Sequence, residues 1–122
     1  MKKRVLLVDD EKDILMSMKM VMESRGFEAI TASAAEPALS LLRREKFDLL
    51  IIDLLMPKVN GAALLKEIRA DPVLKHLKVA VLTVVRRDEP QGKELAALKP
   101  DEYFSKPIDL KDFDERIKRL LK

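Results

Sequence analysis

Five short runs of apolar and β-prone residues recur along the chain, and stretches with a helical repeat separate them. The runs are RVLLVD (4–9), FEAITA (27–32), FDLLIID (47–53), KVAVLTVV (78–85) and EYFS (102–105). Continuous apolar runs are typical of strands that are buried on both faces, as in a parallel sheet covered by helices. The pattern therefore predicts five parallel strands.

Apolar positions between these runs repeat with the period of a helix. The shared faces are Ile14, Met18, Val21 and Met22; Ala38, Leu41 and Leu42; Leu64, Leu65 and Ile68; and Leu110, Phe113, Ile117 and Leu121. Ser33 is placed to cap the second helix, with Glu36 three residues later. Segment 88–98 has Pro90 and Gly92 near its start, so we expect a short or mobile helix there. Alternation of strand and helix predicts right-handed crossovers, with helices on both faces of the sheet.

Composition limits the kind of protein that this sequence encodes. The 122 residues, 48% of them hydrophobic, fit one compact domain, which we expect to span residues 1–122. The sequence has no Cys, which excludes disulfides and thiolate metal sites and fits a cytoplasmic protein. No run reaches the roughly 18 apolar residues of a membrane span. The net charge of +3 comes with alternating signs along the helical stretches, which argues against direct nucleic-acid binding.

Polar residues follow four of the predicted strands at one edge of the sheet. Asp9 and Asp10 end the first strand, Asp53 ends the third, Thr83 lies near the end of the fourth, and Lys106 follows the fifth. Ligands of open parallel sheets bind outside this edge. Each residue also has an ordinary structural explanation, because an Asp after a strand often caps a helix and Asp53 can simply pair with Lys106. Five such residues at one edge favour a functional site.

The residue types favour phosphoryl chemistry beside a hard metal ion. Converging carboxylates repel one another unless a cation is present, and oxygen ligands without His or Cys suit Mg²⁺. An ionised Asp53 beside that ion can attack a phosphoryl group and form an aspartyl phosphate. The Lys106 ammonium and the Thr83 hydroxyl are suited to binding the phosphoryl oxygens.

At these residues the sequence resembles the receiver domain of two-component response regulators. The matching motifs are LLVDDE (6–11), LLIIDLLMPKVNG (49–61), VLT (81–83) and EYFSKP (102–107), in the order typical of the family. The resemblance is to a chemotaxis-type single receiver and covers essentially the whole chain. It implies a doubly wound (βα)5, flavodoxin-like three-layer sandwich around a five-stranded parallel sheet.

The resemblance implies that Asp53 accepts a phosphoryl group from the phosphohistidine of a sensor histidine kinase or a phosphotransfer protein. It implies Mg²⁺ as cofactor, held by Asp10, Asp53 and the backbone carbonyl of Leu55, with Asp9 acting through water. Kinase specificity in the family resides on the exposed face of the first helix, where Met16, Lys19 and Met20 are expected to lie.

The resemblance also implies a switch made of Thr83 and Tyr103. After phosphorylation the threonine hydroxyl moves toward the phosphate, and the aromatic ring turns into the vacated space. Residues 86–122 are then expected to control a downstream protein or an attached output domain, often by homodimerisation through the same surface. Such a protein is a signalling switch and not a classical enzyme, although it is expected to catalyse its own phosphotransfer.

The sequence departs from the family pattern at a few positions near the site. Val84 stands where a small residue is common, and its branched side chain can narrow the approach to Asp53. Leu55 and Val85, which flank the path of hydrolytic water in the family, are apolar and predict slow autodephosphorylation. Lys99-Pro100 replaces a common Gly-Ala before the fifth predicted strand.

Other interpretations remain open. A Mg²⁺-dependent phosphohydrolase usually carries a second Asp two residues after its nucleophile, where this chain has Leu55. A phosphorylation-independent pseudo-receiver would lack an acidic residue, the Lys or the Thr, and all are present; Val84 and Lys99-Pro100 keep this interpretation open. A stand-alone receiver and a piece of a longer regulator are not distinguished by the sequence.

Overall fold

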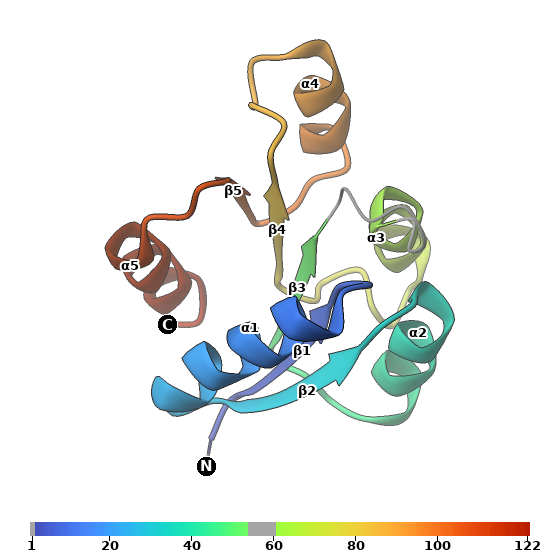
Figure 1. Ribbon diagram of the computed structural model, residues 1–122. Coiled ribbons are helices and arrows are strands. Elements are labelled where there is room, and N and C mark those ends of the chain that lie inside the picture. The colour runs from blue at the N-terminus through green and yellow to red at the C-terminus, as the bar shows by residue number, and fades with distance from the viewer. Residues whose placement is uncertain (1, 54–60) are drawn as a thin grey trace.

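The computed structural model describes residues 2–53 and 61–122 and shows a sheet between two layers of helices (Figure 1). The strands are β1 (Arg4–Val8), β2 (Glu28–Ala32), β3 (Leu49–Asp53), β4 (Val79–Thr83) and β5 (Glu102–Ser105). The helices are α1 (Lys12–Ser24), α2 (Ala35–Arg44), α3 (Gly61–Ala70), α4 (Pro90–Ala96) and α5 (Leu110–Leu120). The expected alternation of strand and helix is confirmed.

The five strands form one parallel sheet in the order β2-β1-β3-β4-β5. The chain moves from β1 outward to β2 and then returns past β1 to β3, so the direction of winding reverses between β1 and β3. In register, Val8 pairs with Ile52 and Thr83 pairs with Ser105. The reversal point of such a sheet is where ligands bind, at the carboxyl ends of the strands. The predicted doubly wound fold is confirmed.

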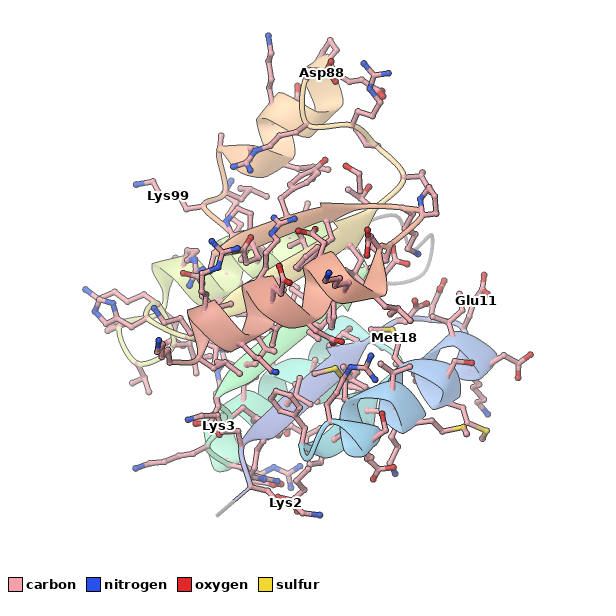
Figure 2. The ribbon with its side chains drawn as sticks, turned by 90° about the vertical axis from the view of Figure 1, so that its left-hand side faces the viewer. Lys2, Lys3, Glu11, Met18, Asp88 and Lys99 are labelled. Atoms are coloured by element: carbon pink, nitrogen blue, oxygen red, sulfur yellow. The ribbon has the colours of Figure 1, made fainter. Side chains whose placement is uncertain are left out.

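Each face of the sheet has its own apolar core. Helices α1 and α5 cover one face and α2 and α3 the other, and Figure 2 shows α1 and α5 together on the side toward the viewer. Side chains alternate along β1, since Val5 and Leu7 pack with α1 and α5 whereas Leu6 and Val8 pack on the opposite face. All residues of β3 and β4 are buried, which explains their continuous apolar sequences. Each buried Leu, Ile or Val contributes about 1.5–3 kcal/mol relative to exposure.

Three details of the predicted helices differ from the structure. Leu110 is the first residue of α5 and is 52% exposed, so the core contact of that helix comes from Phe113 and Ile117. In α1 the buried residues are Leu15, which the predicted face did not include, and Met22. The other predicted residues of that face, Ile14, Met18 and Val21, are only partly buried. Ser33 does not cap α2, because Ala34 occupies the N-cap position and makes no side-chain capping bond. The expectation of a short helix is confirmed by α4, which has seven residues.

The loop before β5 shows how the chain accommodates Lys99-Pro100. Lys99 has a φ of 61°, in the left-handed region that glycine adopts without cost. The Arg69 guanidinium holds this turn, because it donates hydrogen bonds to the Lys99 carbonyl (3.1 Å) and to the Asp101 carboxylate (2.9 Å). It also bonds the carbonyl of Leu77 (2.7 Å), which ties the turn before β4 to the same side chain.

Candidate functional site

Asp53 is the last residue of β3 and lies at the carboxyl edge of the sheet, at the reversal point. Its side chain is only 9% exposed, and its Oδ2 accepts a hydrogen bond from Lys106 Nζ at 2.5 Å. A carboxylate at this depth needs a counter-charge, because desolvation disfavours its ionised form. The pairing of Asp53 with Lys106 that the sequence allowed is therefore present.

Asp9 follows β1 and is 1% exposed beside Asp53. Its Oδ1 accepts a hydrogen bond from the Glu11 backbone N–H at 3.0 Å, whereas its buried Oδ2 accepts none from the described residues. Burial raises the pKa of Asp9 to about 6; the bond from Glu11 opposes this shift and the nearby Asp53 carboxyl adds to it. The edge of the sheet thus has a buried oxygen that needs a partner, next to a second carboxyl group.

A divalent cation suits this arrangement, because it would satisfy Asp9 Oδ2 directly or through a bound water and would offset the repulsion between the two acids. Within residues 2–53 and 61–122, no three acidic or histidine side chains are arranged to hold a metal by themselves. A site here therefore needs backbone or water oxygens as further ligands, which Mg²⁺ accepts readily. Asp10 is half-buried beside Asp9, and its role as a ligand stays a prediction.

Several predicted features fall in the segment after Asp53. Leu55, whose carbonyl is expected to bind the metal, lies outside the described residues, as does the rest of the motif from 54 to 60. Gly61, the last residue of the same motif, is the first residue of α3 and is buried.

Thr83 and Tyr103 are joined through the backbone N–H and C=O groups of Val85. Thr83 is fully buried, and its Oγ1 accepts a hydrogen bond from the Val85 N–H at 3.1 Å. The Val85 carbonyl in turn accepts a hydrogen bond from the Tyr103 hydroxyl at 2.8 Å. Tyr103 is 5% exposed within the core, and the Arg87 guanidinium lies 5.5 Å from the centre of its ring. Sequence reasoning missed the part played by Val85, because a backbone link leaves no residue signature.

The main chain fixes Lys106 relative to Thr83. The Lys106 N–H donates to the Thr83 carbonyl at 2.7 Å, which continues the pairing of β4 and β5 beyond Ser105. Val84, directly after Thr83, is 62% exposed. The structure thus brings Asp9, Asp53 and Lys106 together and places Thr83 beside them on the adjoining strand.

The exposed face predicted for α1 is confirmed. Met16 and Met20 are 65% and 67% exposed, and Lys19 is exposed between them. None of the described helices is long and apolar enough to cross a membrane.

Comparison with known proteins agrees with this geometry. A family model described as "Response regulator receiver domain" matches residues 5–118. Among curated relatives, the alkaline phosphatase synthesis transcriptional regulatory protein PhoP of Bacillus subtilis is 33% identical over all of this chain and half of its own length. A probable transcriptional regulator, ycf27 of Guillardia theta, is 36% identical over 99% of this chain and 46% of its own. The chain spans about half the length of the curated relatives it matches.

Solved structures show the same fold. The response regulator TrrA from Thermotoga maritima, in complex with Mg²⁺-BeF, aligns with a TM-score of 0.81 at 32% identity and covers 98% of this chain and 99% of its own. The chemotaxis response regulator CheY4 of Vibrio cholerae aligns with a TM-score of 0.85 at 25% identity, over 99% of this chain and 100% of its own. The chain therefore belongs to the response regulator receiver domain family, the receiver domains of two-component systems.

Proposed function

We propose that this domain, spanning residues 1–122, is a phosphorylation-activated switch that accepts a phosphoryl group on Asp53 from a sensor histidine kinase or a phosphotransfer protein. The observation that supports this most is the position of Asp53, which ends a buried strand, contacts Lys106 and lies beside Asp9, whose Oδ2 has no hydrogen-bond partner among the described residues. A carboxylate held in place next to a cation is suited to nucleophilic attack on phosphorus.

In the proposed reaction a carboxylate oxygen of Asp53 forms a bond to phosphorus, and the P–N bond of the phosphohistidine breaks with its electron pair left on the imidazole nitrogen. The Lys106 ammonium, which contacts Asp53 before the reaction, is close enough to stabilise the transferred oxygens afterwards. Asp10, Asp53 and the Leu55 carbonyl would hold Mg²⁺, with Asp9 acting through water. When bound, Mg²⁺ supplies further positive charge to the phosphoryl oxygens.

The hydrogen bonds of Val85 suggest how phosphorylation of Asp53 would change the structure outside the site. A Thr83 hydroxyl that turns to a phosphoryl oxygen loses the hydrogen bond from the Val85 N–H, and the carbonyl of the same residue is the acceptor of the Tyr103 hydroxyl. The loop between β4 and α4 would then reposition, together with α4, β5 and α5. Energetically this is a population shift driven by the affinity of the phosphoryl group for one arrangement of the loop.

We propose that residues 86–122 present the output surface in the cytoplasm. The curated relatives named above are transcriptional regulators about twice as long as this chain, so the partner is a downstream protein or an attached output domain, and homodimerisation belongs to the same proposal. We propose no direct nucleic-acid binding by this domain.

A slow loss of the phosphoryl group follows from the apolar residues near the site. Val85 is buried and has no polar side-chain atom with which to orient a hydrolytic water. We expect the phosphorylated protein, followed by intact mass after removal of the donor, to persist for much longer than seconds. Decay within seconds would contradict the proposed slow autodephosphorylation.

Hydrogen exchange with and without beryllofluoride, which stands in for the phosphoryl group, tests the switch. In the presence of Mg²⁺ we expect exchange to change in residues 84–105 of the wild type and of Glu36→Gln, a control at an exposed carboxylate outside the monitored segment. Asp53→Asn is expected to show no change. An equal response in Asp53→Asn would overturn the proposal.

A further inference from the structure

A pocket of about 290 Å³ lies between α1 and α5, away from Asp53. Lys3 precedes β1 and Phe27 precedes β2, so this pocket opens at the amino ends of the strands, whereas Asp53 lies at their carboxyl ends. Figure 2 shows the same separation, with Lys3 and Glu11 near opposite ends of β1. Its volume is at the lower limit of roughly 300–1,000 Å³ typical of small-molecule sites.

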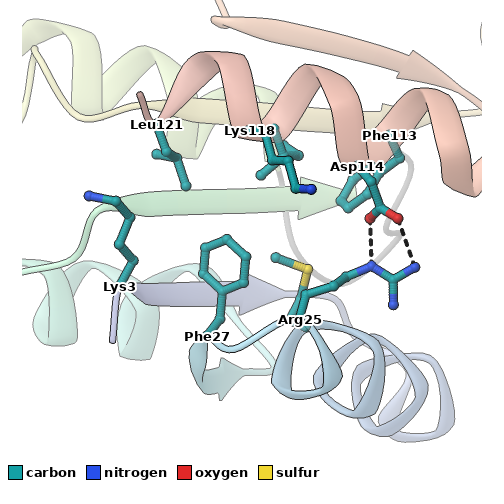
Figure 3. A pocket seen from close by; sticks show the side chains of 9 residues that line it. Lys3, Arg25, Phe27, Phe113, Asp114, Lys118 and Leu121 are labelled. Atoms are coloured by element: carbon teal, nitrogen blue, oxygen red, sulfur yellow. Dashed lines mark hydrogen bonds and ion pairs between the residues drawn. The ribbon is translucent and has the colours of Figure 1, made fainter. Parts of the chain in front are cut away.

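The floor of the pocket is apolar and comes from three parts of the chain. Met22 of α1 and Phe113 and Ile117 of α5 are buried there, while Phe27 and Leu121 are only partly buried. Figure 3 shows the Phe27 ring between Lys3 on one side and the Arg25–Asp114 pair on the other. An apolar body that fills this space would remove from water the surface of Phe27 and Leu121 that is still exposed.

The rim carries three cations and one anion, namely Lys3, Arg25, Lys118 and Asp114. Arg25 binds Asp114 with two hydrogen bonds, of 2.5 Å and 2.9 Å, and this contact holds the pKa of Asp114 below its ordinary value. Arg25 therefore balances the charge of Asp114, and the nearby Lys118 ammonium also lowers the pKa of this carboxyl. Neither Lys3 nor Lys118 forms an ion pair with an acidic side chain in the described part of the chain.

We propose that this pocket binds a small amphipathic carboxylate. Its apolar chain or ring lies against Phe27 and Ile117 on the floor, and its anionic head lies between Lys3 and Lys118. The charge of the rim decides the sign of the ligand, because three cations face one acid and the rim stays positive after Arg25 has paired with Asp114. The apolar floor requires a ligand with an apolar chain or ring, because a carboxylate without one would leave the apolar surface of the pocket in water. Lys2, which lines an adjoining hollow with Lys3 and Arg25, adds to the positive potential.

The pocket shares no residue with the phosphorylation site, so ligand binding here does not depend on the proposed phosphorylation of Asp53. It lies at the apolar core on the face of the sheet that α1 and α5 cover, where Phe113 packs against Phe104 of β5 with ring centroids 4.9 Å apart. Because no ligand-contacting residue is part of the Asp53 site, Asp53→Asn is expected to bind the ligand as the wild type does. Binding to Asp53→Asn therefore tests the pocket independently, and either proposal can fail without the other.

The test is a titration of the full chain with decanoate below its micelle concentration, followed by ¹H–¹⁵N NMR. We expect saturable shifts confined to the amides of residues 22–27 and 113–121 and of Lys3. Lys3→Gln with Lys118→Gln is expected to weaken binding by roughly tenfold, because two partly exposed charge contacts are lost. Lys111→Gln, on the exposed start of α5, is the matched control and should bind as the wild type does.

Two further probes separate the contributions of the head group and the chain. Decan-1-ol, which lacks the charge, and acetate, which lacks the chain, are each expected to bind at least roughly tenfold more weakly than decanoate. Three results would overturn the inference: shifts that do not saturate or that scatter over the surface, equal binding of decan-1-ol and decanoate, or unchanged affinity in the double lysine variant.

Discussion

Asp53 is an acidic side chain at the end of an otherwise apolar strand, and Lys106 supplies the charge that balances it. The 2.5 Å contact between them, and the raised pKa of the adjacent Asp9, both follow from burial at the edge of a sheet that is covered on two faces. Sequence reasoning predicted this pair because a buried acid needs a cation. It did not predict the unbonded Oδ2 of Asp9, which depends on tertiary burial.

The first prediction at the residue scale concerns Val84. Because this side chain is 62% exposed, Val84→Ala is expected to change the free energy of unfolding by less than about 0.5 kcal/mol. The rate of phosphorylation of Asp53 by acetyl phosphate is expected to rise by roughly threefold or more, since the smaller side chain widens the approach. Val73→Ala, at a position 85% exposed, serves as control. Equal rates in wild type and Val84→Ala would show that Val84 does not limit access.

A second prediction concerns the pH dependence that Asp9 confers. Its pKa is raised from 3.8 to about 6 in the folded state, so the folded protein binds this proton more tightly than the unfolded chain does. The stability that results is present below about pH 4 and is lost as the pH rises through about 6. Without divalent cations, this group alone is expected to lower the free energy of unfolding by up to about 3 kcal/mol between pH 4 and 7.

Denaturant unfolding of wild type and Asp9→Asn across this pH range measures the contribution of Asp9. The Asn variant is expected to be the more stable of the two at pH 7 without Mg²⁺, and the difference should shrink toward pH 4. Parallel pH profiles for the two proteins would contradict the assigned pKa shift.

At the scale of elements, α4 is held by a close backbone contact. A Cβ at Gly92 would lie 1.9 Å from the Arg86 carbonyl oxygen, a distance that no real contact allows. Helix propensity alone favours Ala over Gly by about 1 kcal/mol in a helix. Gly92→Ala is nevertheless expected to destabilise α4 or displace it from the loop before it, because the clash is with backbone.

Hydrogen exchange in residues 86–98 tests this expectation. We expect faster exchange in Gly92→Ala than in the wild type, and no such change in Lys93→Ala, an exposed neighbour on the same helix. Slower exchange in Gly92→Ala would mean that propensity outweighs the close contact.

The elements differ in how much of them the sequence predicts. The strands are evident because both faces are buried, so every residue of β3 and β4 is apolar or belongs to the site. Helix boundaries are less evident, and the cap assigned to Ser33 was wrong because α2 starts after Ala34. Leu110 fits the helical repeat of α5, yet it is exposed because it lies at the first turn, beyond the edge of the core.

At the scale of the whole molecule, the order of the strands places the site. Reversal between β1 and β3 brings Asp9 and Asp53 to one edge, and the addition of β4 and β5 on one side brings Thr83 and Lys106 to the same edge. The sequence predicted the shared edge, because all strands of a parallel sheet end on one side. It did not specify the neighbours, since the strand order depends on pairing between distant segments.

The central claim is that Asp53 accepts a phosphoryl group in a Mg²⁺-dependent reaction. The most direct test is intact-protein mass measurement after incubation with acetyl phosphate, with and without Mg²⁺, for wild type and Asp53→Asn. We predict addition of one phosphoryl group to the wild type with Mg²⁺ and none to Asp53→Asn. Addition to Asp53→Asn, or no addition to the wild type with Mg²⁺ from acetyl phosphate or from a panel of phosphorylated kinases, would contradict the claim and favour a phosphorylation-independent binding module.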